Sequence, residues 1–211
     1  MPKLPEKNRK LCHGLKNRIM GIFQKNYTKY SQAELMQFIR SGNKAAFDEL
    51  YKRYAQKMLM FFYRMLANDN DKAQDFTHDL FLKIIENPES YDTNRSFDTW
   101  IFTLAYNICK NEYKKLKIRQ LHYTEQQITA ENIVYLNDDF DSKLFQKHLH
   151  QHLQQLDEEH KSIIILRFEE ELTVKEIAQI VNCPEGTVKS RIFYSLKALS
   201  VKLSVFNPLN N

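Results

Sequence analysis

The sequence predicts an all-α fold of two small helical domains joined by a flexible acidic linker, the second domain containing a helix-turn-helix. The chain has 211 residues but only four Gly and five Pro, too few for a protein built from tight β-hairpins. Apolar residues recur at helical spacing on both sides of residues 118–141, whereas that stretch has no firm period. Between Thr124 and Asp141 it carries five acidic residues and no Lys or Arg, a composition typical of a linker.

Charge and apolar pattern divide the chain into five segments. They are a basic N-terminal extension, a first helical domain, the linker, a second helical domain and a tail, at residues 1–30, 31–117, 118–141, 142–203 and 204–211. The extension holds eight Lys or Arg and one acidic residue. Such an arm can touch DNA or a membrane surface, but we favour a mobile tail, and Met20 is an alternative start.

Capping residues locate the first two helices of the first domain. Ser31 caps a helix that runs to about Arg40, and Asn43 caps a longer one that ends before Asp69–Asp71. The apolar positions of the longer helix are Phe47, Leu50, Tyr51, Tyr54, Met58, Phe61, Phe62 and Met65.

Two more helices complete the first domain. One runs from about Lys72 to Glu86 and ends before Pro88, with acidic residues facing outward. Its expected inward residues are Phe76, Leu80, Phe81, Ile84 and Ile85. A loop over residues 87–96 leads to a helix from about Phe97 to Lys117, whose start is apolar and aromatic and whose end is basic. Trp100, in that helix, fits either the core or a contact with DNA, and we favour the core.

The second domain carries the helix-turn-helix between Leu172 and Leu199. Thr173 and Glu176 form a capping box, and Asn182 tolerates the left-handed conformation of a tight turn. Pro184 suits the first position of the second helix. That helix has an apolar stripe at Val188, Ile192, Leu196, Leu199 and Leu203.

The opposite face of this second helix has the chemistry of a DNA-recognition helix. Lys and Arg can bind phosphates, while Arg, Ser, Thr and Phe can contact base edges in the major groove. The candidate DNA-binding residues are Thr187, Lys189, Ser190, Arg191, Phe193 and Tyr194. The alternative is an ordinary helical hairpin with a solvated basic face.

Other function classes have weaker signals. His148 and His152 share the i, i+4 spacing of zinc ligands, with His150 between them, but there is no H-E-x-x-H pattern and the segment is rich in Gln. We expect no metal, no cofactor and no catalytic site, since neither a Gly-rich phosphate loop nor a nucleophile elbow is present. Cys12, Cys109 and Cys183 show no paired spacing.

We also expect a cytoplasmic protein without a membrane span. No run of 18 apolar residues occurs, and the N-terminus lacks the apolar segment of a secretory signal.

Four stretches in order give the chain a family resemblance. They are AQDFTHDLFLKI at 73–84, SFDTWIFTLAYNICKNEYKK at 96–115, LDEEHKSIIILRF at 156–168 and TVKEIAQIVNCPEGTVKSR at 173–191. Over roughly residues 33–203 the chain resembles the extracytoplasmic-function sigma factors, members of the sigma-70 family of bacterial RNA polymerase. The resemblance implies a non-enzymatic subunit that binds core polymerase and reads two promoter elements.

The resemblance also implies roles for individual residues. Asp75, Asp79 and Leu82 would dock on core polymerase, and the helix-turn-helix residues named above would read the minus-35 element. The minus-10 element would be recognised and opened by Asn94, Arg95, Ser96, Phe97, Asn107, Lys110, Lys114 and Lys115. Opening needs a surface for an unstacked base and basic groups along the freed strand.

Further implied partners are promoter DNA and an anti-sigma factor, and the acidic linker would thread the polymerase channel that later holds RNA. The chain departs from the usual family residues at His78, Asp79, Tyr106 and Asn111. The second hypothesis is a promoter-binding regulator that does not join polymerase, which would leave the first domain unexplained.

Overall fold

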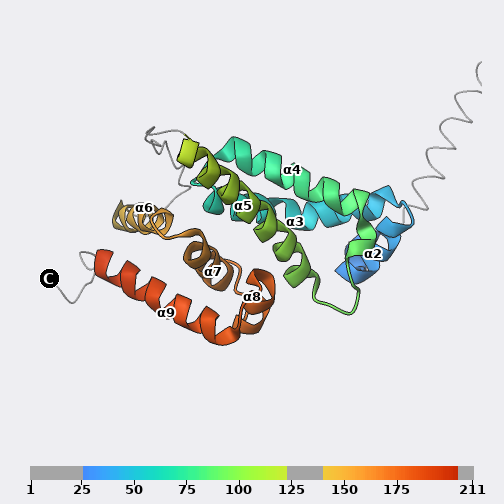
Figure 1. Cartoon of the computed structure of the whole chain (residues 1–211). Helices are drawn as coiled ribbons and strands as arrows, with labels where there is room; N and C mark the ends of the chain where they lie inside the picture. The colour runs from blue at the N-terminus through green and yellow to red at the C-terminus, as the bar shows by residue number, and fades with distance from the viewer. Residues whose placement is uncertain (1–25, 123–139, 204–211) are drawn as a thin grey trace, which may run out of the picture.

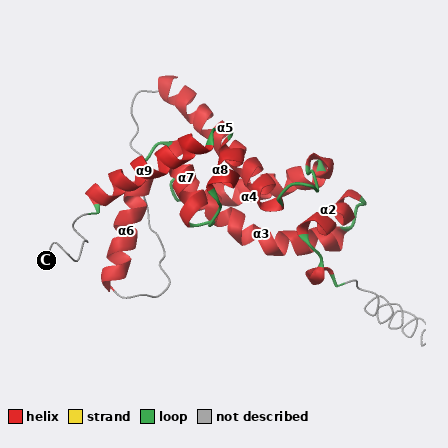
Figure 2. Ribbon diagram, turned by 90° about the horizontal axis from the view of Figure 1, so that it is seen from below, coloured by secondary structure: helices red, strands yellow, loops and turns green. Residues whose placement is uncertain are grey.

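The computed structural model describes residues 26–122 and 140–203, and all the regular elements in these two ranges are helices (Figures 1 and 2). The all-α prediction is therefore confirmed for these residues. The elements are η1 Tyr27–Lys29, α2 Gln32–Arg40, α3 Lys44–Met65, α4 Asn70–Glu86, η2 Pro88–Ser90, α5 Phe97–His122, α6 Phe140–Gln154, α7 Glu158–Phe168, α8 Val174–Val181 and α9 Glu185–Lys202.

The predicted linker is helical at both of its ends. Helix α5 continues to His122, five residues beyond its predicted end at about Lys117, and α6 begins at Phe140, two residues before the predicted start of the second domain at 142. Leu, Lys, Arg and Gln, which fill residues 116–121 together with Ile118, are good helix formers and continue the helix without an apolar stripe. Residues 123–139 lie outside the described residues, as do 1–25, with the alternative start at Met20, and the tail 204–211.

Side-chain caps set the helix starts of the first unit, residues 26–122. Ser31 and Glu34 form a capping box, in which the Glu34 N–H donates to Ser31 Oγ at 3.3 Å. Asn43 Oδ1 accepts from the Ala46 N–H at 3.0 Å. Asp69 caps α4 in the same way, so α4 begins at Asn70, two residues earlier than predicted.

Helix α3 lies at the centre of the first unit and packs against α2, α4 and α5 (Figure 1). Its buried residues include Met58, Phe61 and Phe62, as the apolar pattern predicted. Ile85 of α4 was predicted to point inward but is exposed. The buried positions of α4 follow helical spacing as Ala73, Thr77, Leu80, Phe81 and Ile84, and Ile85 lies one residue beyond that face.

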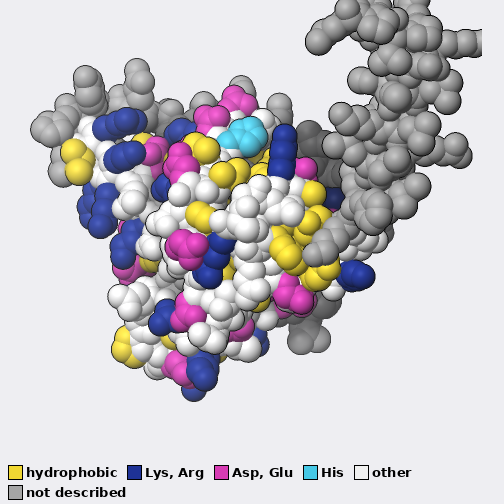
Figure 3. Space-filling view, turned by 90° about the vertical axis from the view of Figure 1, so that its right-hand side faces the viewer, with side chains coloured by type: hydrophobic (Ala, Val, Ile, Leu, Met, Phe, Trp, Pro, Cys, Tyr) yellow, Lys and Arg dark blue, Asp and Glu magenta, His cyan; other side chains and the backbone are white. Residues whose placement is uncertain are grey.

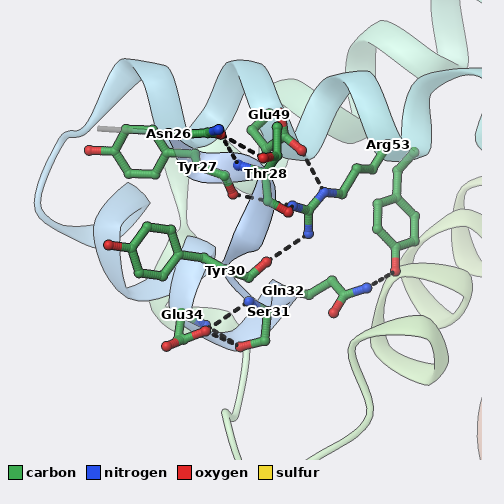
Figure 4. Close-up of polar contacts among 10 residues, drawn as sticks. Asn26, Tyr27, Thr28, Tyr30, Ser31, Gln32, Glu34, Glu49 and Arg53 are labelled. Carbon is green, nitrogen blue, oxygen red and sulfur yellow. Dashed lines mark hydrogen bonds and ion pairs between the residues drawn. The ribbon is translucent and has the colours of Figure 1, made fainter. Parts of the chain in front are cut away.

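An arginine of α3 fixes the segment that precedes α2 (Figure 4). Arg53 donates to the carbonyl oxygens of Tyr30 at 2.8 Å, Thr28 at 2.7 Å and Tyr27 at 3.2 Å. Its Nε also donates to Glu49 Oε1 at 2.8 Å, which orients the guanidinium. Residues 26–30, which the sequence assigned to the extension, are therefore packed on α3.

Replacing Arg53 by Met is expected to lower the free energy of unfolding by about 1–3 kcal/mol. Three carbonyl groups would lose a charged donor while the aliphatic part of the side chain is kept. Urea denaturation measures the effect, and Lys52→Met on the exposed face of α3 is the control. Equal losses in both variants would contradict this role for Arg53.

In the second unit, residues 140–203, helix α7 is buried over six consecutive residues, Lys161 to Leu166, of which the last four are apolar. A helix that is apolar all round must be covered on several sides. Helix α7 packs against α8 and α9 of its own unit and against α3 and α5 of the first unit.

Candidate nucleic-acid interface

Local sequence signals build the helix-turn-helix as predicted, with one change. The Thr173 N–H donates to Glu176 Oε2 at 2.9 Å, which completes the capping box of α8. Asn182 adopts the left-handed conformation, with φ 53° and ψ 56°. Pro184 was predicted at the first helical position but has ψ 147°, so it precedes α9 as its cap residue and the helix begins at Glu185.

The buried face of α9 differs from the predicted stripe at one position. Val188 and Leu199 are buried and Ile192 is partly buried, but Leu196 is 42% exposed. Ser195 occupies the buried position instead. Positions 188, 192, 195 and 199 follow the helical repeat better than a constant spacing of four, which drifts around the helix.

The opposite face of α9 presents the predicted minus-35 residues to different degrees. Lys189 and Ser190 are exposed, and Phe193 and Tyr194 are each 62% exposed, with their rings in edge contact. Thr187 is partly buried. Arg191 is partly buried as well, and its guanidinium pairs with Glu159 at the start of α7.

Asp92, which the sequence reasoning missed, organises the loop over residues 87–96. Its carboxylate accepts from the backbone N–H of Asn94 at 3.0 Å and lies 3.6 Å from Arg95 Nε. The Tyr91 hydroxyl donates to the Arg95 carbonyl at 2.8 Å. Asn94, Arg95 and Ser96 are thereby held exposed. The turn signal in Asp-Thr-Asn pointed to such an Asx turn.

The structure places Phe97 in the core rather than on the surface. It is 5% exposed, and its ring contacts Tyr54, Tyr91 and Trp100 at centroid distances of 4.9, 5.3 and 5.4 Å. Phe97 starts α5 and its ring cannot reach a base in this arrangement. Trp100 is half-buried in the same aromatic cluster, which favours the core interpretation.

The remaining predicted minus-10 residues lie along α5. Asn107, Lys114 and Lys115 are exposed, and Lys110 is partly buried with Nζ 5.9 Å from the Tyr106 ring centroid. Positions 107, 110 and 114 share one helix face. Tyr106 is buried, and this burial, with the Glu159 and Glu158 carboxylates adding to it, raises the pKa of its hydroxyl.

The predicted polymerase-docking residues share an exposed face of α4. Asp75, Asp79 and Leu82 follow one another at i, i+4 and i+7, and all three are exposed. Ile85, three residues after Leu82, extends the apolar part of this face. On the molecular face in Figure 3, Lys and Arg lie among Asp and Glu, so neither sign of charge dominates there.

The histidines do not assemble a metal site within the described part of the chain. The His148 and His152 rings lie 6.3 Å apart, and His150 instead contacts Asn68 of the first unit. No group of three His, Cys, Asp or Glu in residues 26–122 and 140–203 is placed to hold a metal ion. Over the same ranges, no helix is both long and apolar enough for a bilayer crossing.

Comparison with known proteins explains why two units carry these surfaces. The Sigma-70 region 2 model matches residues 50–118, and the Sigma-70 region 4 model matches residues 152–200. The ECF RNA polymerase sigma factor SigW of Bacillus subtilis (strain 168) is 30% identical over 175 residues, covering 78% of this chain and 92% of SigW. The chain belongs to the extracytoplasmic-function sigma factors.

A further relative and two solved structures are also similar to this sigma factor. The RNA polymerase sigma-H factor of Pseudomonas aeruginosa is 29% identical over 188 residues, covering 83% of this chain and 95% of that protein. Two solved structures share the fold at 20% identity: CnrH bound to the cytosolic domain of CnrY, with TM-score 0.61, and RpoE of Bartonella quintana bound to the anti-sigma factor NepR, with TM-score 0.60. They cover 82% and 75% of this chain, which covers 97% of each.

The family membership decides between the functional alternatives. A regulator outside polymerase would leave the first unit unexplained, whereas region 2 accounts for residues 50–118. The sigma factor is an RNA polymerase subunit with promoter-recognising regions 2 and 4, and its family is not enzymatic.

Proposed function

We propose that this sigma factor joins core RNA polymerase, reads the minus-35 element with α9, and recognises and opens the minus-10 element with the loop over 87–96 and α5. The observation that carries the proposal is that regions 2 and 4 each present their own set of exposed polar and basic side chains, to which region 4 adds the exposed rings of Phe193 and Tyr194. The two units, residues 26–122 and 140–203, are the proposed domains, close to the sequence boundaries 31–117 and 142–203.

At the minus-35 element, α9 is proposed to enter the major groove. Lys189 and Ser190 are exposed near its N-terminal end, where a recognition helix contacts base edges. Phe193 and Tyr194 add exposed aromatic surface one turn further along. Arg191 would contact DNA once its ion pair with Glu159 is broken, and Thr187 would contact DNA at the edge of this interface.

At the minus-10 element, the loop and α5 are proposed to divide the work. Asn94, Arg95 and Ser96 would hold an unstacked base, with Phe97 supporting the loop from beneath. Asn107 would add a polar contact, while Lys110, Lys114 and Lys115 would follow the backbone of the freed strand.

Core polymerase is proposed to bind the α4 face of Asp75, Asp79 and Leu82. Exposed acids beside exposed apolar side chains suit a protein interface with a buried apolar centre and a charged rim. Among the structural neighbours, RpoE is complexed with an anti-sigma factor, so an anti-sigma factor is a proposed partner here as well. The proposed compartment is the cytoplasm.

Combining Asp79→Ala and Leu82→Ala is expected to weaken binding to core polymerase on the order of tenfold. Both side chains are exposed, so the fold should not change. Affinity is measured with labelled sigma factor and purified core polymerase, and run-off transcription reports the functional loss. Asp48→Ala, on an exposed face of α3, is the control. If the double variant binds core polymerase with normal affinity, the docking surface does not include Asp79 and Leu82.

A further inference from the structure

The backbone of the loop over residues 87–96 is bound to α2 by one arginine. Helix α2 lies beside η2, and Arg40 is its last residue (Figure 1). Arg40 Nε donates to the Pro88 carbonyl oxygen at 3.4 Å, and Nη2 donates to that of Tyr91. The same Nε lies 3.2 Å from a carboxylate oxygen of Glu89. Because a planar guanidinium presents several N–H groups, one arginine can hold these three groups at once.

The side chain of Tyr91 extends this constraint to the second half of the loop. Tyr91 is 2% exposed, and its ring packs against Phe97 and Trp100 at centroid distances of 5.3 and 5.0 Å. Its hydroxyl donates to the Arg95 carbonyl at 2.8 Å. Burial raises the pKa of this hydroxyl, so it stays protonated and remains a donor. Arg40 therefore holds the backbone of a residue whose side chain holds the backbone four residues later.

The exposed part of the loop surrounds the Arg95 carbonyl that Tyr91 holds. Asn94, Arg95 and Ser96 are exposed. The Asp92 carboxylate accepts from the Asn94 N–H at 3.0 Å, and the Asp92 carbonyl accepts from the Arg95 N–H at 2.9 Å. A surface loop with few buried side chains is ordinarily mobile. When such a loop is held before DNA arrives, binding avoids the entropy cost of ordering it.

Arg40 is not itself placed to read a base. Its Nε and Nη2 bind the backbone and Glu89, and its side chain is 26% exposed. It lies ten residues before the segment 50–118 that the region 2 model matches. We infer that Arg40 is a positioning residue for minus-10 recognition: it contacts no base, but through Tyr91 it fixes the loop that receives an unstacked base. This inference rests on the proposed function of the loop.

Binding of single-stranded oligonucleotides to the assembled polymerase tests this role. The probes carry the nontemplate strand of the minus-10 element from a promoter that this polymerase transcribes, and in each probe one base is replaced by an abasic site. The recognised base is the one whose removal weakens binding to the unmodified protein most. In Arg40→Met, the intact oligonucleotide should bind about tenfold more weakly. The oligonucleotide without the recognised base should bind as it does to the unmodified protein, because it offers the loop nothing to hold.

Arg53→Met is the matched control. Arg53 also donates from a helix of the first unit to backbone carbonyl groups, but these belong to residues 27, 28 and 30 and not to the loop. This variant should lose stability and keep the preference for the intact oligonucleotide. Tyr91→Phe keeps the buried ring and removes the hydroxyl, so it should lose the preference as Arg40→Met does. Because Arg40 and Tyr91 act in series, the double variant should bind hardly more weakly than the more affected single variant.

Hydrogen exchange in the free chain separates this inference from the proposed function. In Arg40→Met, the Asn94 and Arg95 amides should exchange about tenfold faster, while the amides of α3 keep their protection. An unchanged preference for the intact oligonucleotide, or unchanged exchange in the loop, would overturn the role of Arg40. If even the unmodified protein binds intact and abasic oligonucleotides alike, the proposed function of the loop fails, while the exchange still decides whether Arg40 holds it.

A second variant covers the case in which Arg40→Met does not fold, as judged by circular dichroism. Arg40→Lys keeps the positive charge beside Glu89 but replaces the planar guanidinium by a single ammonium. It should show a smaller loss of the same kind, about threefold for the intact oligonucleotide, and faster exchange in the loop. Full preference and full protection in a folded Arg40→Lys would then count against the inference.

Discussion

Alanine at Lys189 or Arg191 is expected to weaken binding of the assembled polymerase to a promoter with an intact minus-35 element. If one of these two side chains contacts a base edge, its replacement should reduce the binding free energy by about 1–3 kcal/mol and relax the sequence preference at that base pair. The one that binds phosphate should weaken all promoters alike and reduce the salt dependence by about one counterion. Lys189 is exposed on α9, and Arg191 is partly buried at the edge of the face that carries Val188 and Leu199.

Competition between promoter fragments with single base changes, repeated over a salt series, distinguishes these two roles. Lys44→Ala is a charge-matched control, because Lys44 is exposed at the start of α3 in the other unit. If both α9 variants bind every fragment like the unmodified protein, α9 does not read the promoter. The Arg191→Ala substitution also removes the cation that forms an ion pair with Glu159.

Phe102→Ala is expected to lower the free energy of unfolding by about 3–5 kcal/mol. The Phe102 ring is 0% exposed, packs edge to face on Phe61 at 5.3 Å, and lies under the ammonium of Lys57 at 5.1 Å. Truncation would remove apolar contact and leave a cavity in close-packed surroundings. Urea denaturation followed by fluorescence of Trp100, the single tryptophan, measures the change.

The matched control is Phe193→Ala on α9. The ring of Phe193 is exposed, so its loss should change stability by less than about 0.5 kcal/mol. The same variant should nevertheless weaken promoter binding if Phe193 contacts DNA. A stability loss that is equal in the two variants would show that the assignment of Phe102 to the core is wrong.

Helix starts could be predicted from the sequence because their causes are local. Ser31, Asn43 and Thr173 each bond to a backbone N–H three residues away, so a window of four residues contains the whole signal. The left-handed Asn182 is equally local. Local chemistry alone predicted the helix-turn-helix and gave no function to the first helical domain. The family motifs identified both domains as promoter-reading regions.

The buried residues of each helix and the residues that they contact were harder to predict, because both depend on segments far away in the sequence. Ile85 and Leu196 are apolar and stand next to buried positions, so a stripe drawn one residue off looks equally good. Phe97 was assigned to the surface because the aromatic rings that bury it come from Tyr54 of α3 and from Tyr91 within the loop over 87–96. Lys161 gave no sign of burial, although the unbroken run Ile163 to Leu166 in its helix indicated cover on several sides.

Helix α3 is held by two separate sets of contacts along its length. Arg53, near the middle of the helix, binds the segment from Asn26 to Tyr30, and Lys161 and Gln154 bind its last carbonyl groups. Arg53 and Met65 are roughly 18 Å apart along the helix axis. A factor that pulled on the N-terminal segment and a factor that separated the two units would therefore act at different points along α3. Either could act without undoing the other.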